Sequence, residues 1–181
     1  MDLQKFGIKF FLKNEKSFSS KDYISVFHQW IQNKSISGHL LIDVADYSHV
    51  LDGPGVMLMA HEGYFSLDQE DLVPGLLYMR KVDLEGDFSA RFFEVFSITL
   101  EAVRLLSQEN LEFCQNSFRF IVNDRRLAEN TMENQNIFKE NISKILHVKY
   151  SDASWEFDAE AKENERLAFS INFTSNINLL I

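Results

Sequence analysis

The chain is poor in cysteine and proline, and this scarcity excludes two classes of protein. Its 181 residues include one cysteine and two prolines. The lone Cys114 cannot close an internal disulfide, and its neighbours Phe113 and Gln115 carry no positive charge that would activate the thiol. We therefore expect Cys114 to be a small core residue. No proline-rich or low-complexity linker divides the chain.

Long apolar runs are also absent. Nowhere does the chain approach the ~20 consecutive apolar residues that a membrane-spanning helix needs. The amino-terminal stretch MDLQKFGIKFFLKNEK has no continuous apolar segment of the kind found in secretory signals. These features predict a cytoplasmic protein without a membrane partner.

Positive charge is in the minority, since 18 lysines and arginines face 27 acidic residues and leave a net charge of -9. Binding to a nucleic-acid backbone depends on basic residues that release counterions from the phosphates. The short basic pairs of interest are Arg80-Lys81 and Arg125-Arg126, which do not form a stripe. The charge pattern therefore argues against nucleic acid as a partner.

The common catalytic signatures are missing. His61-Glu62 is followed by Gly63 and has no second histidine at the spacing of a zincin. Ser48 adjoins His49, but neighbours on an extended chain point apart, and no G-x-S-x-G elbow occurs. The turn at residues 53–55, Gly-Pro-Gly, leads toward a strand rather than a helix, so it is neither a phosphate loop nor a dinucleotide fingerprint. Its glycines more simply permit a tight turn with positive φ.

What the chain does have is enough length for one well-buried domain. Alternating apolar residues predict strands at Phe6–Leu12, His39–Val44, Val56–Ala60 and Gly75–Lys81. We expect Leu40, Ile42 and Val44 to share one face of the second strand, and we place Val56–Ala60 near the centre of the sheet because both of its faces are apolar. Tyr64–Leu67 either continues that strand or begins a hairpin return.

Three helices are expected between these strands. Ser19 opens a capping-box pattern, and Tyr23, Phe27, Trp30 and Ile31 then fall on one helical face. The longest helix should run from Phe88 to Ser107, with Asp87 as its cap and with one buried side formed by Phe92, Phe96, Leu100, Val103 and Leu106. A third helix should start at residues 130–133 and bury Phe138, Ile142, Ile145 and Leu146.

The remaining segments predict strands at Ser117–Val122, Trp155–Ala159 and Leu167–Phe173, the last two forming a hairpin. Residues 174–181 form a tail that either docks on the sheet or lies against another subunit. The expected fold is therefore a single α+β domain over residues 1–181, with a mainly antiparallel sheet of seven or eight strands and three helices on one face.

Polar residues gather where a core would not place them, around the Gly-Pro-Gly turn in the stretch Asp43–Asp68. Its acids and histidines are ligand types that transition metals accept, but no complete ligand set can be named, so we assign neither metal nor cofactor. Together with a second polar loop at residues 123–126, it supplies these candidate site residues: Asp43, Asp46, His49, His61, Glu62, Arg80, Asp124 and Arg125.

Each candidate also has a structural interpretation. Aspartates in loops commonly bond the local backbone. Partial burial of Glu62 would suit acid–base chemistry, whereas an ion pair with Arg80 or Arg125 would explain the same residues without catalysis. We favour the ion pair. The arginines of the loop at residues 123–126 offer forks for a carboxylate or phosphate, but a solvated loop before the third helix is the simpler interpretation.

Three strings carry a resemblance, namely DVADYSHVLDGPGVMLMAHE, GLLYMRK and IVNDRRLAEN. Together they resemble a family of uncharacterised bacterial proteins of similar length, and the likeness extends over most of the chain. It implies a bacterial, single-domain, cytoplasmic protein. No activity is attached to that family, so the resemblance transfers no catalytic residue.

Two functional hypotheses follow. In the first, the protein is a non-catalytic binding or assembly module whose sheet edge or apolar tail engages another protein chain or a second copy of itself. In the second, His61, Glu62, Asp43 and Asp46 form a small-molecule or metal site, with hydrolysis as one activity it would allow and with Arg80 or Arg125 orienting an anionic group. The first is preferred because no catalytic constellation is complete.

Overall fold

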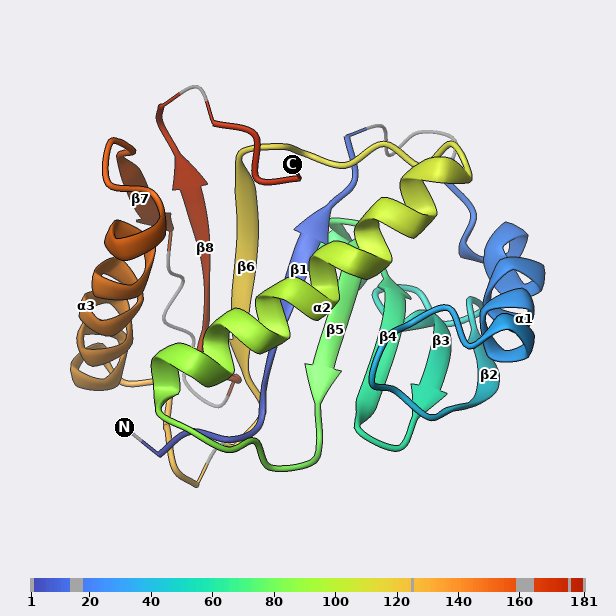
Figure 1. Cartoon of the computed structure of the whole chain (residues 1–181), viewed down its shortest axis with the longest axis horizontal. Coiled ribbons are helices and arrows are strands. Elements are labelled where there is room, and N and C mark those ends of the chain that lie inside the picture. The colour runs from blue at the N-terminus through green and yellow to red at the C-terminus, as the bar shows by residue number, and fades with distance from the viewer. Residues whose placement is uncertain (1, 14–17, 125, 159–164, 176, 181) are drawn as a thin grey trace.

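A single eight-stranded sheet organises the molecule (Figure 1). The computed structural model describes residues 2–13, 18–124, 126–158, 165–175 and 177–180. The strands lie in the order β2-β3-β4-β5-β1-β6-β8-β7, and every neighbouring pair is antiparallel. Their bounds are β1 (Phe6–Phe11), β2 (Leu41–Tyr47), β3 (Gly55–Ala60), β4 (Gly63–Asp68), β5 (Gly75–Arg80), β6 (Ser117–Val122), β7 (Trp155–Asp158) and β8 (Ala168–Phe173).

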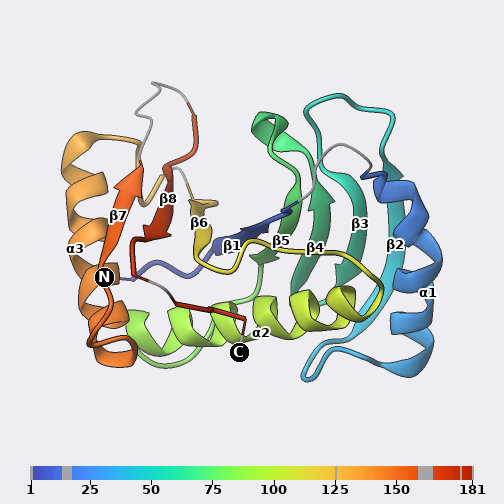
Figure 2. The same ribbon diagram turned by 90° about the horizontal axis from the view of Figure 1, so that it is seen from above.

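Three α-helices cover one face of this sheet, so the predicted α+β class is confirmed. Helix α2 (Phe88–Gln108) crosses the middle strands, α1 (Ile24–Asn33) lies at the β2 end and α3 (Met132–Lys149) at the β7 end (Figures 1 and 2). In the part of the chain described, no helix combines the length and apolarity that a membrane crossing requires.

Phenylalanine side chains form the centre of the core between sheet and helices. Phe6, Ile8 and Phe10 of β1 alternate onto the helix side and are fully buried, as predicted. The Phe10 ring lies 5.6 Å from that of Phe96 on α2, centroid to centroid. Because alternate residues of a strand point to opposite faces, Gly7 and Lys9 of β1 lie on the face without helices. That face carries the site described below.

The predicted cap of α2 is confirmed, and α3 begins within the predicted residues 130–133. Asp87 accepts a hydrogen bond from the Ala90 N–H, and Thr131 accepts one from the Asn134 N–H. The capping box at Ser19 is wrong, because its side chain makes no cap hydrogen bond. The chain enters α1 through a 3₁₀ turn (Ser20–Tyr23), and there the backbone carbonyl of Ser19 accepts from the Asp22 N–H.

The register of β2 differs from the prediction. A β-bulge separates Leu41 from Asp43, so Leu41 is buried while Leu40 and Ile42 are 63% and 57% exposed. A bulge inserts one extra residue and thereby breaks the simple alternation on which the prediction relied.

Strand β3 is an interior strand but is second from the β2 edge, not central. One face of β3 is buried in the main core, which also contains Phe27 and Trp30 of α1, and the other face carries the half-buried Met57 and Met59. The segment after His61-Glu62 forms the separate strand β4, which brings the sheet from seven strands to eight.

The carboxyl-terminal hairpin of β7 and β8 is confirmed, and residues 159–164 between its strands lie outside the described residues. The tail docks on its own molecule. Leu179 is buried, its N–H donates to the Gln115 carbonyl, and the Leu180 carbonyl accepts from Arg104 Nε. Cys114 is half-buried rather than a core residue.

The predicted positive φ in the Gly-Pro-Gly turn is found at Gly55, whose φ is 61°. A Cβ there would lie 2.1 Å from the Leu67 carbonyl oxygen, whereas a Cβ at Gly38, with φ 67°, would meet nothing within 4 Å. We expect Gly38→Ala to cost about 1 kcal/mol of unfolding free energy from backbone strain alone, and Gly55→Ala about 2–3 kcal/mol. Urea unfolding of both variants checks this, and equal losses would contradict a steric role for Gly55.

Candidate functional site

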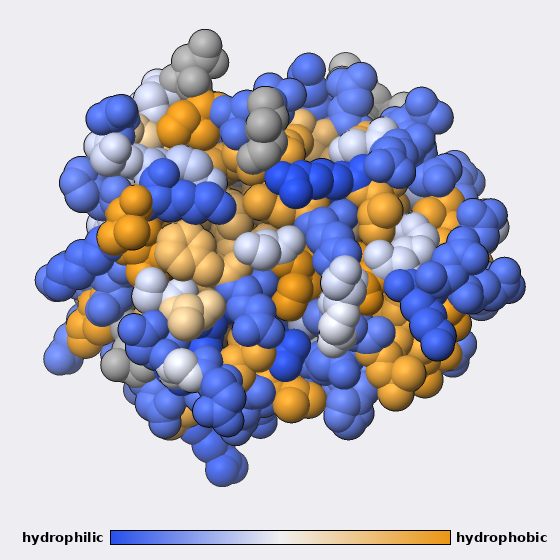
Figure 3. Space-filling view, viewed as in Figure 1, coloured by the Kyte–Doolittle hydropathy of each residue, from blue (hydrophilic) through white to orange (hydrophobic). Residues whose placement is uncertain are grey.

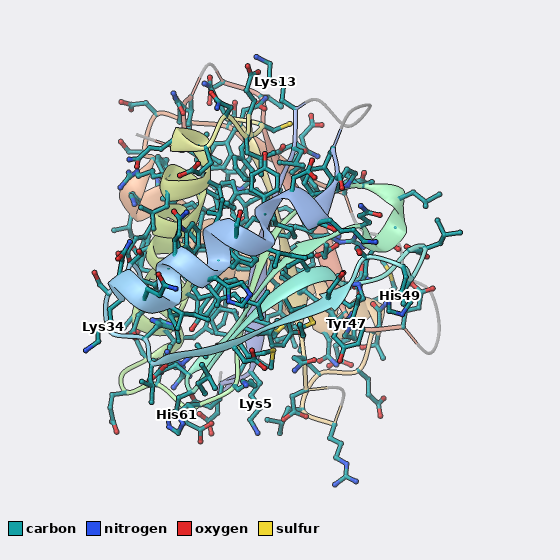
Figure 4. All side chains as sticks on the ribbon, turned by 90° about the vertical axis from the view of Figure 1, so that its right-hand side faces the viewer. Lys5, Lys13, Lys34, Tyr47, His49 and His61 are labelled. Carbon is teal, nitrogen blue, oxygen red and sulfur yellow. The ribbon has the colours of Figure 1, made fainter. Side chains whose placement is uncertain are left out.

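The candidate residues predicted around the β2–β3 hairpin lie at its two opposite ends. In Figure 4, Tyr47 and His49 lie together at one end while His61 lies at the other. The strand register agrees, because Tyr47 pairs with Gly55 and Leu41 with Ala60. A strand of six residues spans about 20 Å at ~3.3 Å per residue, which is too far for His49 and His61 to share a ligand.

Asp43, Asp46 and Asp124 bond the local backbone. Asp43 Oδ1 accepts from the Val44 N–H at 2.8 Å, and Asp124 Oδ1 accepts from the Arg126 N–H at 3.1 Å. Asp46 Oδ1 accepts from both the N–H and the hydroxyl of Ser48, and these bonds hold the pKa of the Asp46 carboxyl below its ordinary value. Arg125 lies outside the described residues.

Glu62 caps a backbone amide instead of pairing with Arg80. Its Oε2 accepts from the Leu40 N–H at 2.9 Å, and no ion pair within 4.0 Å joins Glu62 to Arg80, both of which the structure describes. Partial burial acts to raise the pKa of Glu62. The backbone hydrogen bonds and the nearby His39 and His61 lower this pKa by more than burial raises it, so the net shift is downward. A lowered pKa is the opposite of what a general acid needs at neutral pH.

Arg80 belongs to a closed network with Tyr78 and His39. Its Nε donates to the Val82 carbonyl at 2.8 Å, and its Nη1 donates to the Tyr78 hydroxyl at 3.4 Å. His39 Nε2 lies 2.6 Å from the same hydroxyl. Burial raises the pKa of Tyr78 to about 12, and its side chain is fully enclosed. Tyr78 and Arg80 are therefore enclosed in the protein interior, half-buried His39 lies at its edge, and the three side chains are engaged with one another.

No metal centre emerges from the predicted acids and histidines. Within the described ranges, no three His, Cys, Asp or Glu side chains are grouped as a metal ion would require. The seven candidates that the structure describes thus do not form one site.

A different set of charged residues converges on the face without helices. Lys9 of central strand β1 and Asp68 at the end of β4 are each 1% exposed, and Lys9 Nζ lies 2.5 Å from Asp68 Oδ1. Strand β5 lies between β1 and β4, and the Lys9 side chain passes over it at Gly75. A Cβ added at Gly75 would lie 2.9 Å from Lys9 Cε. The glycine therefore makes this buried ion pair sterically possible.

Two further ion pairs hold the loop after β4 over the sheet. Arg119 of β6 bonds the Asp71 carboxylate, and Arg166 Nη2 lies 2.8 Å from Glu70 Oε2. In Figure 2, the β4–β5 loop and the residues preceding β8 rise from the side of the sheet opposite α2. The ion pairs thus connect the two sides of a depression that lies over β1 and β6.

A polar cavity of about 240 Å³ lies in this depression, and a larger cavity of about 630 Å³ adjoins it. The two share Asp52, Asp71, Arg119 and Ala168 in their walls. Buried Ile121 supplies an apolar surface, and it packs with a small cluster formed by Leu77, Met79, Tyr64 and Ala168. We call this pair of cavities the trough.

Two buried polar atoms in the walls of the trough lack hydrogen-bond partners in the described part of the chain. They are Asp68 Oδ2, an acceptor, and Arg119 Nε, a donor. A buried polar group left unsatisfied costs about 1–3 kcal/mol, so native proteins rarely retain one without a reason.

The loop that walls the trough also has a strained backbone. Asp71 and Leu72 have φ of 61° and 57°, and Asp52, whose Oδ1 accepts from the Asp71 N–H, has φ 55°. Non-glycine residues with positive φ cost energy and tend to cluster at ligand sites. The strain and the unsatisfied atoms thus coincide in one place.

Burial raises the pKa of Asp68 to about 6, against the attraction of the Lys9 ammonium. The carboxylate is therefore desolvated, and any ligand that donates to it would stabilise its charged form.

Sequence reasoning did not find the trough. Asp68 stood at the margin of the polar stretch considered, but Lys9, Arg119 and Arg166 were not singled out. The available signal was Lys9 itself, because a lysine inside the apolar strand Phe6–Phe11 has to find a partner when it is buried.

Comparison with known proteins adds no assignment, since the chain matches no protein-family model and no curated protein.

Proposed function

We propose that the protein is a non-catalytic binding module and that the trough on the helix-free face binds a small polar molecule. The observation that carries the proposal is that Asp68 and Arg119 line one cavity and each hold a buried polar atom without a hydrogen-bond partner, Oδ2 and Nε respectively. Binding sites generally combine an apolar wall with a few fixed polar groups. Ile121 supplies the wall, and the ion pairs of Lys9 and Arg119 fix the polar groups.

The opposite face is less suited to such a role. In Figure 3, hydrophobic residues on the helix-covered face are interspersed with hydrophilic ones. Scattered apolar residues are ordinary on a protein surface and indicate no particular ligand.

Two-dimensional ¹H–¹⁵N NMR tests the proposal with a panel of amino acids, amines, dicarboxylates, sugars and nucleotides. At least one class should produce saturable shifts in the amides of Asp68, Asp71, Arg119 and Ala168. Arg119→Gln should weaken that binding at least tenfold, while Arg126→Gln, an exposed arginine away from the trough, should leave it unchanged. Saturable shifts confined to other parts of the molecule, or none across the panel, would refute the proposal.

A second candidate function is engagement of another protein chain, or a second copy, through the edge strand β2. Five large apolar side chains are exposed along this strand and its turn: Leu40, Ile42, Tyr47, Val50 and Leu51. Unpaired sheet edges readily add a strand. The β2 bulge and the carboxylate of Asp43, which occupies the Val44 N–H, work against such addition.

Light scattering after size exclusion separates these outcomes for self-association. A dimer that becomes monomeric on Ile42→Lys would support the edge interface. A strictly monomeric protein at every concentration would remove self-assembly and leave a different protein chain as the partner that this edge could engage.

A further inference from the structure

Building on the proposed function, we infer that the trough selects a small organic cation, an ammonium compound with a hydroxyl or similar acceptor a few carbon atoms away. Three features of the smaller cavity lead to this class: its charge balance, the polarity of its two unsatisfied atoms, and its size.

With Glu165 left aside, the described walls of the smaller cavity hold four acidic side chains, Asp52, Asp68, Glu70 and Asp71, against three basic ones. Its basic groups, Lys9, Arg119 and Arg166, each already face a carboxylate. Asp52, a further acid in the wall, accepts a hydrogen bond from the neutral N–H of Asp71. An added anion would therefore meet an excess of negative charge, whereas an added cation would reduce it.

The unsatisfied atoms require opposite groups from a ligand. Asp68 Oδ2 needs a donor, and a charged ammonium makes the stronger bond to a carboxylate. Arg119 Nε needs an acceptor, which a hydroxyl or carbonyl oxygen provides. A ligand with both groups satisfies the two atoms together, and methylene groups between them would lie against Ile121 and Ala168.

The size of the smaller cavity limits the ligand. Its volume of about 240 Å³ corresponds to about eight water molecules at ~30 Å³ each. A compound with a short carbon chain fits such a volume, whereas a nucleotide would extend into the adjoining cavity of about 630 Å³.

Three compounds of equal length and different charge test the inference: 4-amino-1-butanol, 1,4-butanediol and 4-hydroxybutanoate. In ¹H–¹⁵N NMR titrations at pH 7.5, the aminoalcohol should shift the amides of Asp68, Asp71, Arg119 and Ala168 with a dissociation constant on the order of millimolar. The diol should bind at least tenfold more weakly, and the carboxylate should not bind.

Variants connect this selectivity to the trough. Asp68→Asn should weaken binding of the aminoalcohol at least tenfold, and Asp52→Asn, which alters an exposed wall residue, should weaken it severalfold and covers the case in which Asp68→Asn fails to fold. Asp83→Asn removes the same charge from an exposed position outside both cavities and should have no effect.

The inference and the proposed function fail differently. Equal binding of all three compounds, or preference for the carboxylate, would overturn cation selectivity and leave the trough as a binding site. Trough binding by other members of the panel, without any by the aminoalcohol, would do the same. Absence of saturable binding at the trough by every compound would overturn both.

Discussion

Lys9→Met is expected to lower the free energy of unfolding by about 3–5 kcal/mol at pH 8, because it leaves the Asp68 carboxylate buried without its counter-charge. Lys9 and Asp68 are each 1% exposed, so solvent cannot replace the lost partner. The loss should be smaller at pH 5, where Asp68 takes up a proton and no longer needs a cation. Urea unfolding at the two pH values provides the measurement.

The double variant Lys9→Met/Asp68→Leu serves as the control, because it removes both charges and keeps the volume apolar. Replacing a whole buried ion pair by apolar residues is often neutral or stabilising. The double variant should therefore recover most of the stability that Lys9→Met loses. A single variant as stable as the wild type at pH 8 would show that the pair is hydrated or loosely held.

Titration of Asp68 should make the folded protein less stable as the pH rises from about 4 to about 7. Burial raises the pKa of Asp68 from 3.8 to about 6, so between these values the folded state holds more protons than the unfolded state. A difference of about two pKa units corresponds to about 3 kcal/mol, at 1.36 kcal/mol per unit. The sign is opposite to that of a carboxylate stabilised by a surface ion pair.

The free energy of unfolding of the wild type, minus that of Lys9→Met/Asp68→Leu, isolates this contribution from the other carboxylates. It should fall by about 2–3 kcal/mol between pH 4 and pH 7. The other charged or titratable groups near Asp68, namely Tyr64, Glu70 and Arg166, are present in both proteins. A difference that stays constant or rises with pH would show that the attraction of Lys9 outweighs burial.

The elements of the fold were largely predictable because they depend on local patterns. Phe6, Ile8 and Phe10 alternate with period two, and Phe92, Phe96, Leu100 and Val103 recur at helical spacing, and the buried faces match both patterns. The prediction failed where a local rule had a competitor. The bulge after Leu41 shifted the register of β2, and the 3₁₀ turn before α1 replaced the Ser19 cap.

The candidate site residues predicted from the sequence do not form one site, because local interactions and strand geometry hold them apart. Asp43, Asp46 and Asp124 satisfy nearby backbone amides, which is the structural alternative that their position in loops suggested. His49 and His61 are near in sequence but lie at opposite ends of a hairpin. Closeness along an extended strand is not closeness in space, because each residue advances the chain by ~3.3 Å.

By itself, the sequence determined which segments form strands and helices, the predominance of acid over base, and which side of most elements is buried, β2 excepted, since these follow from residue type and spacing. Only the tertiary structure decided that β1 lies between β5 and β6, and this order brings Lys9, Asp68 and Arg119 to one cavity. Those three residues come from strands or strand ends far apart in the chain. Strand order depends on how all the apolar faces pack together, and no local pattern encodes it.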